Sequence, residues 1–268
     1  MAVDQYEVYA VKYAERVERS RAESFIFDTT HDVPHPIDYF VWVIRNADRT
    51  ILVDTGYDTS EASRRQRPIL IEPAEALSKI GISPDSVENA IITHLHYDHA
   101  GGLDQFPNAR LHLQEAEMVY ATGPCMCHKV LKIPFTADHV CQMVKRVYGG
   151  SVAFHDGDAA VAPGVTVHKI GGHSRGLQAV RVETADGPLV LASDAAHFYE
   201  NYERRNPFPL VVDVADMLDG FDVLTRLAGE RKLVVPGHDP LVLKRFPAAF
   251  EGAGPEVRRL DRGSLECL

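Results

Sequence analysis

Residues 91–102 read IITHLHYDHAGG, and the first of them belong to an apolar run, Ala90–Thr93, with the composition of a β-strand. Four potential metal ligands follow this run within six residues: His94, His96, Asp98 and His99. Proteins of the α/β class usually place their chemistry in the loop beyond the carboxyl end of a strand. Zinc, iron and manganese accept imidazole and carboxylate ligands. The stretch therefore predicts a metal site at the carboxyl edge of a sheet.

The number of ions follows from the crowding of this loop. Four ligating groups within six residues cannot all meet one ion comfortably, so the loop predicts two ions. We expect His94 and His96 to face one ion, and Asp98 and His99 to face the other. A cluster of surface histidines explains the spacing poorly, because neighbouring cationic imidazoles repel one another without a metal.

Three more candidate ligands occur in matching contexts, each after an apolar run or a glycine turn. His173 follows VTVHKIGG, Asp194 ends PLVLASD, and His238 precedes the last residue of KLVVPGHD. Each residue alone is weak evidence for a metal site, since a single histidine is more often an ordinary polar group than a ligand. Together the four predicted strand ends supply five histidines and two aspartates. This set fits two divalent cations that share one carboxylate and keep an open position for water.

The whole chain of 268 residues is 45% apolar and 25% charged, which is ordinary for a globular protein. Strands and helices alternate without linkers, which predicts one α/β domain over residues 1–268. The predicted strands are Tyr39–Ile44, Ile51–Val53, Ala90–Thr93, Ala109–Leu113, Val165–Ile170, Ala179–Val182, Leu189–Ala192 and Leu233–Val235. The predicted helices are Pro73–Ile80, Glu115–Tyr120 and Asp213–Ala228.

The segment 121–150 differs from the rest because it shows no strong strand pattern and holds three of the four cysteines. We expect a helical insertion that either packs on the surface or forms a lid over a substrate pocket. Cys125, Cys127 and His128 resemble half of a zinc knuckle, but no second cysteine pair completes it. Reduced thiols, with Cys141 as the third in the segment, are the simpler interpretation.

Charge excludes several classes of partner. The chain has 28 Lys and Arg against 38 Asp and Glu, a net charge of −10, so we expect neither nucleic acid nor an anionic membrane to bind a broad basic face. No apolar run approaches the ~18 residues of a membrane span, and the charged N-terminus lacks the apolar stretch of a signal peptide, which predicts a cytoplasmic protein. The basic cluster Arg64–Arg67 is either a solvated turn or a site for a substrate carboxylate. A homodimer is expected only because homodimers are the commonest oligomers of soluble proteins.

These motifs resemble those of the metallo-β-lactamase superfamily, from VDTG at Val53–Gly56 to PGHD at Pro236–Asp239. The resemblance implies a four-layer αβ/βα sandwich with a dinuclear site at one edge of two sheets. It also implies the ligand sets. One metal would take His94, His96 and His173, the other would take Asp98, His99 and His238, and Asp194 would bridge them. Asp54 would support the ligand loop without binding metal.

Asp194 and the sequence that follows it indicate a branch of the superfamily. True β-lactamases lack this bridging carboxylate. Hydroxyacylglutathione hydrolases have it, but they carry a helical domain after the last histidine, and here only 30 residues follow His238 in a chain of 268. The net charge and the small size disfavour the RNase Z type of nuclease. The stretch DAAHFYENYERRNPF, residues 194–208, is similar to the corresponding part of N-acyl homoserine lactonases.

Two residues depart from that lactonase pattern. His197 stands where the lactonases have a tyrosine that hydrogen-bonds the substrate carbonyl, and the nearest phenols are Tyr199 and Tyr202. Either His197 or one of these tyrosines is the candidate oxyanion donor. The second departure is the IGGH sequence that ends at His173, where many members have Pro-Gly-His.

The resemblance implies a hydrolase that opens a lactone ring by attack of a hydroxide held between two divalent ions, most simply zinc, with iron, manganese or cobalt as alternatives. The expected catalytic residues are Asp98, Asp194 and His197, with Asp98 passing a proton to the leaving alkoxide. Hydrolysis of a thioester, a cyclic amide or an aryl ester on the same site is the alternative. A non-hydrolytic iron oxidoreductase is a third class, although the diiron reductases need a flavodoxin-like partner domain and the persulfide dioxygenases use a single iron.

Overall fold

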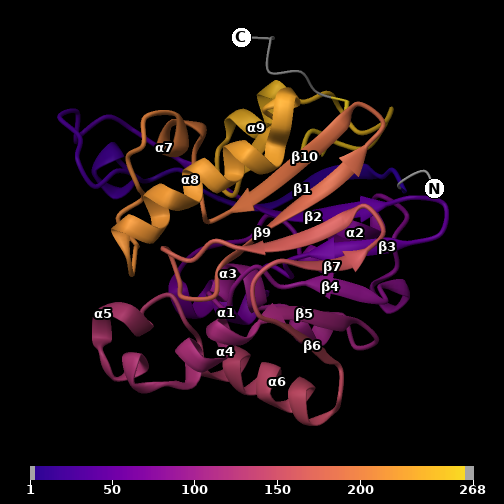
Figure 1. Cartoon of the computed structure of the whole chain (residues 1–268), viewed down its shortest axis with the longest axis horizontal. Helices are drawn as coiled ribbons and strands as arrows, with labels where there is room; N and C mark the ends of the chain where they lie inside the picture. The colour runs from indigo at the N-terminus through magenta and orange to yellow at the C-terminus, as the bar shows by residue number, and fades with distance from the viewer. Residues whose placement is uncertain (1–3, 263–268) are drawn as a thin grey trace.

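Two β-sheets lie face to face in the structure, a computed structural model that describes residues 4–262 (Figure 1). The first sheet has seven strands, in the order β12 (Val257–Arg259), β1 (Glu7–Arg16), β2 (Ile37–Arg45), β3 (Thr50–Val53), β4 (Asn89–Ile91), β5 (Arg110–Gln114) and β6 (Val152–His155). The second sheet has five, in the order β11 (Val234–Pro236), β10 (Gly187–Ser193), β9 (Gln178–Thr184), β8 (Val165–Lys169) and β7 (Ala159–Ala162). Cys267 lies outside the described residues.

Helices cover the outer faces of both sheets. They are α1 (Thr59–Arg65), α2 (Pro73–Ser78), α3 (Tyr97–Ala100), α4 (Glu115–Thr122), α5 (Lys129–Lys132), α6 (Ala137–Tyr148), α7 (Tyr199–Glu203), α8 (Val214–Ala228) and α9 (Leu241–Arg245). Figure 1 shows α4, α5 and α6 together at the lower end of the view, far from α8 and α9. Among residues 4–262, no helix has both the length and the apolar character needed to cross a membrane.

Strand β2 shows why the sheets are buried on both sides. Its alternate residues Phe40 and Trp42 pack between the two sheets, against side chains such as Leu191 of β10. Tyr39 and Val41, on the opposite face, belong to a second core that also includes buried residues of α2, α4 and α6. Successive side chains of a strand point to opposite faces, so a run that is apolar at every position is buried on both.

A third core lies on the outer face of the second sheet. There Phe221 and Leu224 of α8 pack against Val190 and Ala192 of β10. The three cores separate four layers, in the order helices, first sheet, second sheet, helix. The expected four-layer αβ/βα sandwich is confirmed.

The eight predicted strands are all present, and no end is shifted by more than two residues. Strand β4 ends at Ile91, two residues before the predicted end at Thr93, because the amide of Thr93 donates to the carboxylate of Asp54 (2.7 Å). Four strands were not predicted: β1, β6, β7 and β12. In β1 the charged residues interrupt the apolar pattern, and the buried Lys12 is accommodated by an ion pair with Asp38 (2.8 Å).

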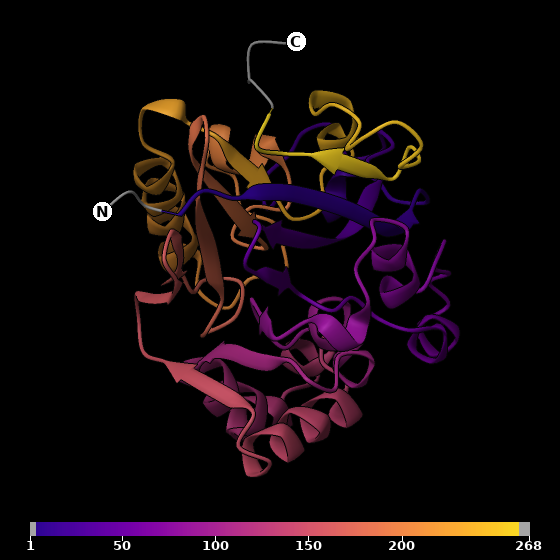
Figure 2. The ribbon, with the colours of Figure 1, turned by 90° about the vertical axis from the view of Figure 1, so that its right-hand side faces the viewer.

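The two ends of the described chain meet in the first sheet. Strand β12 pairs antiparallel with β1, with Tyr9 opposite Arg259. Figure 2 shows β12 (yellow) beside β1 (indigo) along the upper edge of the molecule. The segment 121–150 contains α5 and α6 and no strand, and it packs against the outer face of the first sheet. Its role as a lid stays a prediction.

Candidate metal centre

The candidate ligands meet because the loops that carry them leave their sheets at the same edge. Strands β3, β4 and β5 are parallel, and His94 begins three residues after β4 ends. In the second sheet, β8, β10 and β11 run in the same direction, since β9 is antiparallel to both β8 and β10. His173, Asp194 and His238 follow these three strands in turn. The carboxyl ends of both sheets therefore deliver side chains to one place.

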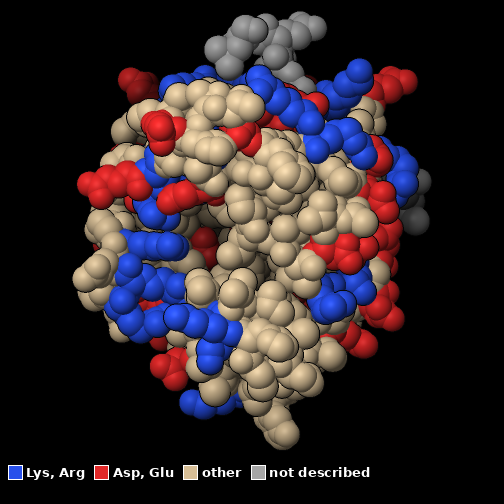
Figure 3. All heavy atoms as spheres, turned by 90° about the vertical axis from the view of Figure 1, so that its left-hand side faces the viewer, with Lys and Arg blue, Asp and Glu red and all other residues tan. Residues whose placement is uncertain are grey.

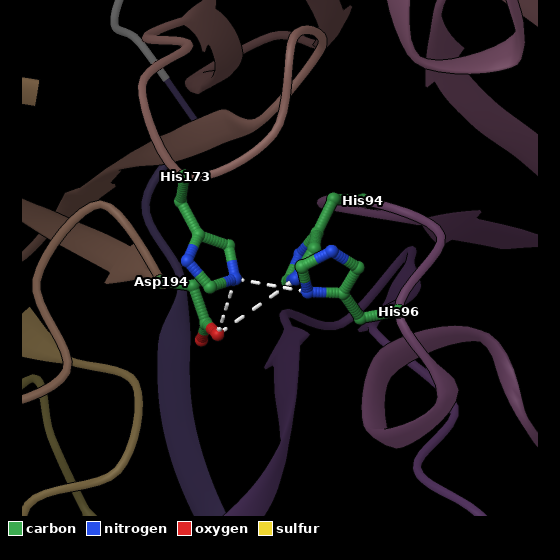
Figure 4. A group of neighbouring side chains, drawn as sticks. All are labelled: His94, His96, His173 and Asp194. Atoms are coloured by element: carbon green, nitrogen blue, oxygen red, sulfur yellow. Dashed lines mark hydrogen bonds and ion pairs between the residues drawn. The ribbon is translucent and has the colours of Figure 1, made fainter. Parts of the chain in front are cut away.

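The first group of ligand atoms is formed by His94, His96, His173 and Asp194, all buried, with one atom of each within 4.8 Å of the others (Figure 4). Nε2 of His173 lies 2.9 Å from Nδ1 of His96 and 3.1 Å from Oδ2 of Asp194. Nε2 of His94 lies 3.7 Å from the same carboxylate oxygen. Figure 4 shows the histidines of the first-sheet loop facing His173 and Asp194 from the second sheet.

The second group is formed by Asp98, His99 and His238. Oδ1 of Asp194 lies 3.2 Å from Nε2 of His99 and 3.0 Å from Nε2 of His238. Oδ2 of Asp98 is 4.0 Å from the first of these nitrogens and 3.9 Å from the second. Asp194 thus presents one carboxylate oxygen to each group, as a bridging ligand would.

The histidine rings are held in fixed orientations by acceptors behind them. Nδ1 of His173 donates to the carbonyl of Leu210 (2.6 Å), and Nδ1 of His238 donates to the carbonyl of Asp38 (2.8 Å). A proton on Nδ1 of a neutral ring leaves Nε2 with a free electron pair. Both Nε2 atoms face Asp194. Such acceptors behind the ligands are the usual way in which a protein orients metal-binding imidazoles.

The donor set fits divalent cations, as the unsatisfied atoms show. Nε2 of His94, Nε2 of His99 and Oδ1 of Asp194 are buried without a hydrogen-bond partner. Burial lowers the pKa of His94 and His96 well below the usual range, which keeps them in the neutral form that ligates. Burial alone would raise the pKa of Asp194, but the surrounding histidines hold it well below its usual value. Buried electron pairs that converge in this way suit a bound cation.

Asp54 organises the loop from behind. One carboxylate oxygen accepts the amide of Thr93 (2.7 Å), and the other contacts the Thr93 hydroxyl (2.8 Å) and Nδ1 of His99 (2.7 Å). The residue has a left-handed backbone, φ 60°, which aspartate tolerates better than most residues and which aims the carboxylate at the loop. Asp54 touches a candidate ligand without facing the cluster itself.

Glu117 of α4 is a second buried carboxylate at the site, and sequence reasoning missed it. One oxygen accepts the amide of Leu95 (2.9 Å), and the other accepts the Ser174 hydroxyl (2.7 Å) and the amide of Gly176 (2.9 Å). Glu117 therefore ties the loop of His94 to the loop of His173. The close packing of Gly176 on Glu117 leaves no space for a β-carbon at that glycine. Nothing in the local sequence EAEM marks this glutamate, because its partners come from distant loops.

His197 lies beside the cluster. Its Nε2 is 3.0 Å from Oδ2 of Asp194, and its ring stacks on Phe208 with centroids 3.6 Å apart. Burial lowers the pKa of His197 to about 3 despite the nearby carboxylate, and its Nδ1 is buried without a partner. Tyr199 and Tyr202 do not line the cavity at the cluster; Tyr199 is buried under the guanidinium of Arg245 instead.

A cavity of about 340 Å³ opens above the ligand cluster. Its floor includes His96, Asp98, His173, Asp194, His197 and His238. Apolar and aromatic residues also line the cavity, among them Ile37, Tyr39 and Phe208, and the segment 121–150 contributes Ile133 and Pro134. A cavity of this size suits a small organic molecule.

Residues 36–238 match the family described as the metallo-beta-lactamase superfamily. The chain belongs to this superfamily. The match includes every candidate ligand, so the resemblance drawn from the motifs is confirmed at the level of the superfamily.

Known relatives place this superfamily member near one branch. An N-acyl homoserine lactonase of Bacillus sp is 27% identical over 242 residues, which cover 83% of this chain and 84% of the relative. The N-acyl homoserine lactonase AiiA of Bacillus thuringiensis subsp. kurstaki is 28% identical over 239 residues, with the same coverage. A solved structure of an N-acyl homoserine lactone hydrolase, with the product N-hexanoyl-L-homoserine at its catalytic metal center, has a TM-score of 0.75 at 23% identity. It matches over 91% of this chain and 96% of its own.

Proposed function

We propose that the protein is a metal-dependent lactonase, a hydrolase that opens the ring of a cyclic ester. The observation that carries the proposal is the convergence of five histidines and two aspartates at one edge of two sheets, under a cavity sized for a small molecule. The similarity to N-acyl homoserine lactonases over more than four-fifths of the chain supports this reaction over the other hydrolyses of the superfamily.

Two divalent cations are proposed for the centre. His94, His96 and His173 would hold one, Asp98, His99 and His238 would hold the other, and Asp194 would touch both. The donor set is rich in imidazole, which favours zinc, and iron, manganese or cobalt fit the same nitrogen and oxygen ligands. When bound, such cations acidify a water molecule and polarise a carbonyl group.

The residues of the chain supply the remaining steps of ring opening. Hydroxide adds to the lactone carbonyl carbon and the ring C–O bond breaks. The proton of the added hydroxyl then passes to the leaving alkoxide, which leaves a carboxylate and an alcohol. Asp98 lines the cavity and is the carboxylate that would transfer this proton. His197, neutral and fixed by its stack on Phe208, would carry its single proton on Nε2, the nitrogen that faces Asp194, and would donate it in a hydrogen bond to the carbonyl oxygen as negative charge develops there.

The test is proton release by the metal-loaded protein against a panel of lactones and thioesters. Ring opening of a lactone is expected, with loss of activity after chelation and in Asp194→Asn. Asp222→Asn is the matched control, because Asp222 lies on the surface of α8, where it pairs with Arg205. Thioester cleavage without any lactone opening contradicts the proposal.

The role of His197 needs its own comparison. Substitution of an oxyanion donor commonly lowers kcat by about 10²–10³ with little change in KM. We expect this for His197→Phe, which keeps the stack on Phe208 and removes both ring nitrogens. A loss confined to metal content would show that His197 acts on the ligand cluster and not on the substrate.

A further inference from the structure

Four arginines line the cavity above the candidate metal centre: Arg16, Arg19, Arg65 and Arg67. Figure 3 shows Lys and Arg atoms gathered along one side of a hollow on this face, with acidic atoms visible inside it. The gathering is unexpected in a chain with a net charge of −10. A guanidinium in an apolar cavity needs either a partner within the protein or an anionic ligand.

Three of these arginines have carboxylate partners. Arg16 pairs with Glu23 (3.4 Å), and Nε of Arg19 lies 3.2 Å from the same glutamate. Arg65 pairs with the buried Glu61 and also donates to the carbonyl of Ile133 (3.1 Å). The hydrogen-bonding capacity of these side chains is therefore used largely to hold the cavity wall together.

Arg67 is different. Its guanidinium donates to the hydroxyl of Tyr97, and within the described part of the chain no carboxylate lies within 4.0 Å of it. The side chain is half-buried. The other two carboxylates that line the cavity, Asp98 and Asp194, belong to the ligand cluster. Once these bind cations, they no longer balance the charge of Arg67.

The position of Arg67 relates it directly to the reacting centre. Tyr97 lies between His96 and Asp98 in the ligand loop, and its hydroxyl contacts the hydroxyl of Tyr39 (3.3 Å). Arg67 is thus one hydroxyl group away from the loop that carries the ligands. Within residues 4–262 the guanidinium makes no other hydrogen bond, and its planar fork of N–H donors matches a carboxylate.

We propose that Arg67 binds a carboxylate of the substrate, so that the preferred substrate is a lactone with a negatively charged substituent. The inference rests on the proposed lactonase function and narrows its substrate class. A neutral acyl lactone would fill the apolar part of the cavity and leave the guanidinium without a counter-ion. A carboxylate at the end of a short acyl chain satisfies it while the ring reaches the metal centre.

Two lactones with the same six-carbon acyl chain test this: N-hexanoyl homoserine lactone, which is neutral, and N-adipoyl homoserine lactone, which ends in a carboxylate. A charge-assisted pair predicts a kcat/KM at least about tenfold higher for the adipoyl compound, with the difference in KM. Arg67→Gln should abolish this preference, so that the ratio of the two kcat/KM values falls to about one. Arg67→Lys should keep part of it. Arg64→Gln is the matched control, because Arg64 belongs to the same basic cluster but does not line the cavity.

A binding measurement separates this inference from the proposed function. Calorimetry would compare the ring-opened products, N-adipoyl-homoserine and N-hexanoyl-homoserine, on the wild-type protein and Arg67→Gln. If no lactone is opened, the lactonase proposal fails, while tighter binding of the adipoyl product that depends on Arg67 still supports the anion site. Equal kcat/KM for the two lactones, or a preference that Arg67→Gln leaves intact, overturns the inference.

Discussion

Nε2 of His173 lies 2.9 Å from Nδ1 of His96, although the two residues leave different sheets. His96 follows a strand of the first sheet, and His173 follows a strand of the second. Two neutral imidazoles that present electron pairs to each other repel, whereas a cation between them binds both. A cation bound by both residues would therefore cross-link the two halves of the sandwich.

Metal removal should lower thermal stability as well as activity. A ligand present at about a thousand times its dissociation constant stabilises the native state by about 4 kcal/mol. For a chain of this size we expect chelation to lower the unfolding temperature by roughly 10 °C. Calorimetry before and after chelation, followed by addition of zinc, measures the effect. An unchanged unfolding temperature after complete removal of metal would contradict the cross-link.

Asp54→Asn should weaken metal binding without removing a ligand. The substitution places an amide against Nδ1 of His99 and the Thr93 hydroxyl, so the ring of His99 loses its negatively charged partner. Loss of such a partner typically costs 10- to 100-fold in metal affinity, as an order of magnitude. Competition with a chromophoric chelator gives the dissociation constants, and Asp222→Asn serves as control. Affinity equal to that of the wild type would exclude this role for Asp54.

Glu117→Gln should destabilise the fold by about 2 kcal/mol. The glutamate accepts three hydrogen bonds from the two ligand loops, and an amide nitrogen in place of one oxygen faces donors it cannot accept from. Urea unfolding of the chelated proteins measures the difference free of metal effects. A variant as stable as the wild type would show that the loops do not depend on this carboxylate.

His112 should make the fold sensitive to mild acid. Burial, with His155 and Arg110 adding to it, lowers the pKa of His112 from 6.5 to about 4 in the folded protein. Between these two values the unfolded chain binds a proton that the folded chain does not, so stability falls as the pH drops from 6.5 towards 4. His112→Gln should remove a part of this slope, on the order of 2 kcal/mol across the window.

Unfolding of wild type and His112→Gln by urea at pH 7 and pH 4.5 measures this difference, and the histidines of the metal centre contribute equally to both proteins. If the free energy of unfolding changes equally with pH in the two proteins, His112 does not cause the loss of stability in acid. Nδ1 of His112 contacts Nε2 of His155 at 3.1 Å, so His155→Gln should change the slope in the same direction.

The convergence of the candidate ligands in residues 94–99 could be predicted from the sequence because the pattern is local: four potential ligating groups occur within six residues after an apolar run. The three more distant candidates were found because each follows a strand, and strand ends meet at sheet edges. Glu117 and the partners of Arg67 could not be found, since their roles depend on contacts with loops far along the chain. Strand β1 was not predicted because its apolar pattern is interrupted by Lys12. The burial of Lys12 depends on its ion pair with Asp38, which is distant in the sequence.

Because β12 pairs with β1, the first sheet can be completed only after nearly the whole chain has been synthesised. Tyr9 and Arg259 are register partners separated by nearly the whole chain. One edge of the first strand made therefore stays open until the last strand of the first sheet has left the ribosome. An open strand edge is a template for pairing with other chains. The interval between these two events is when the nascent protein is most exposed to misassembly, and a chaperone that shields β1 would have its greatest effect then.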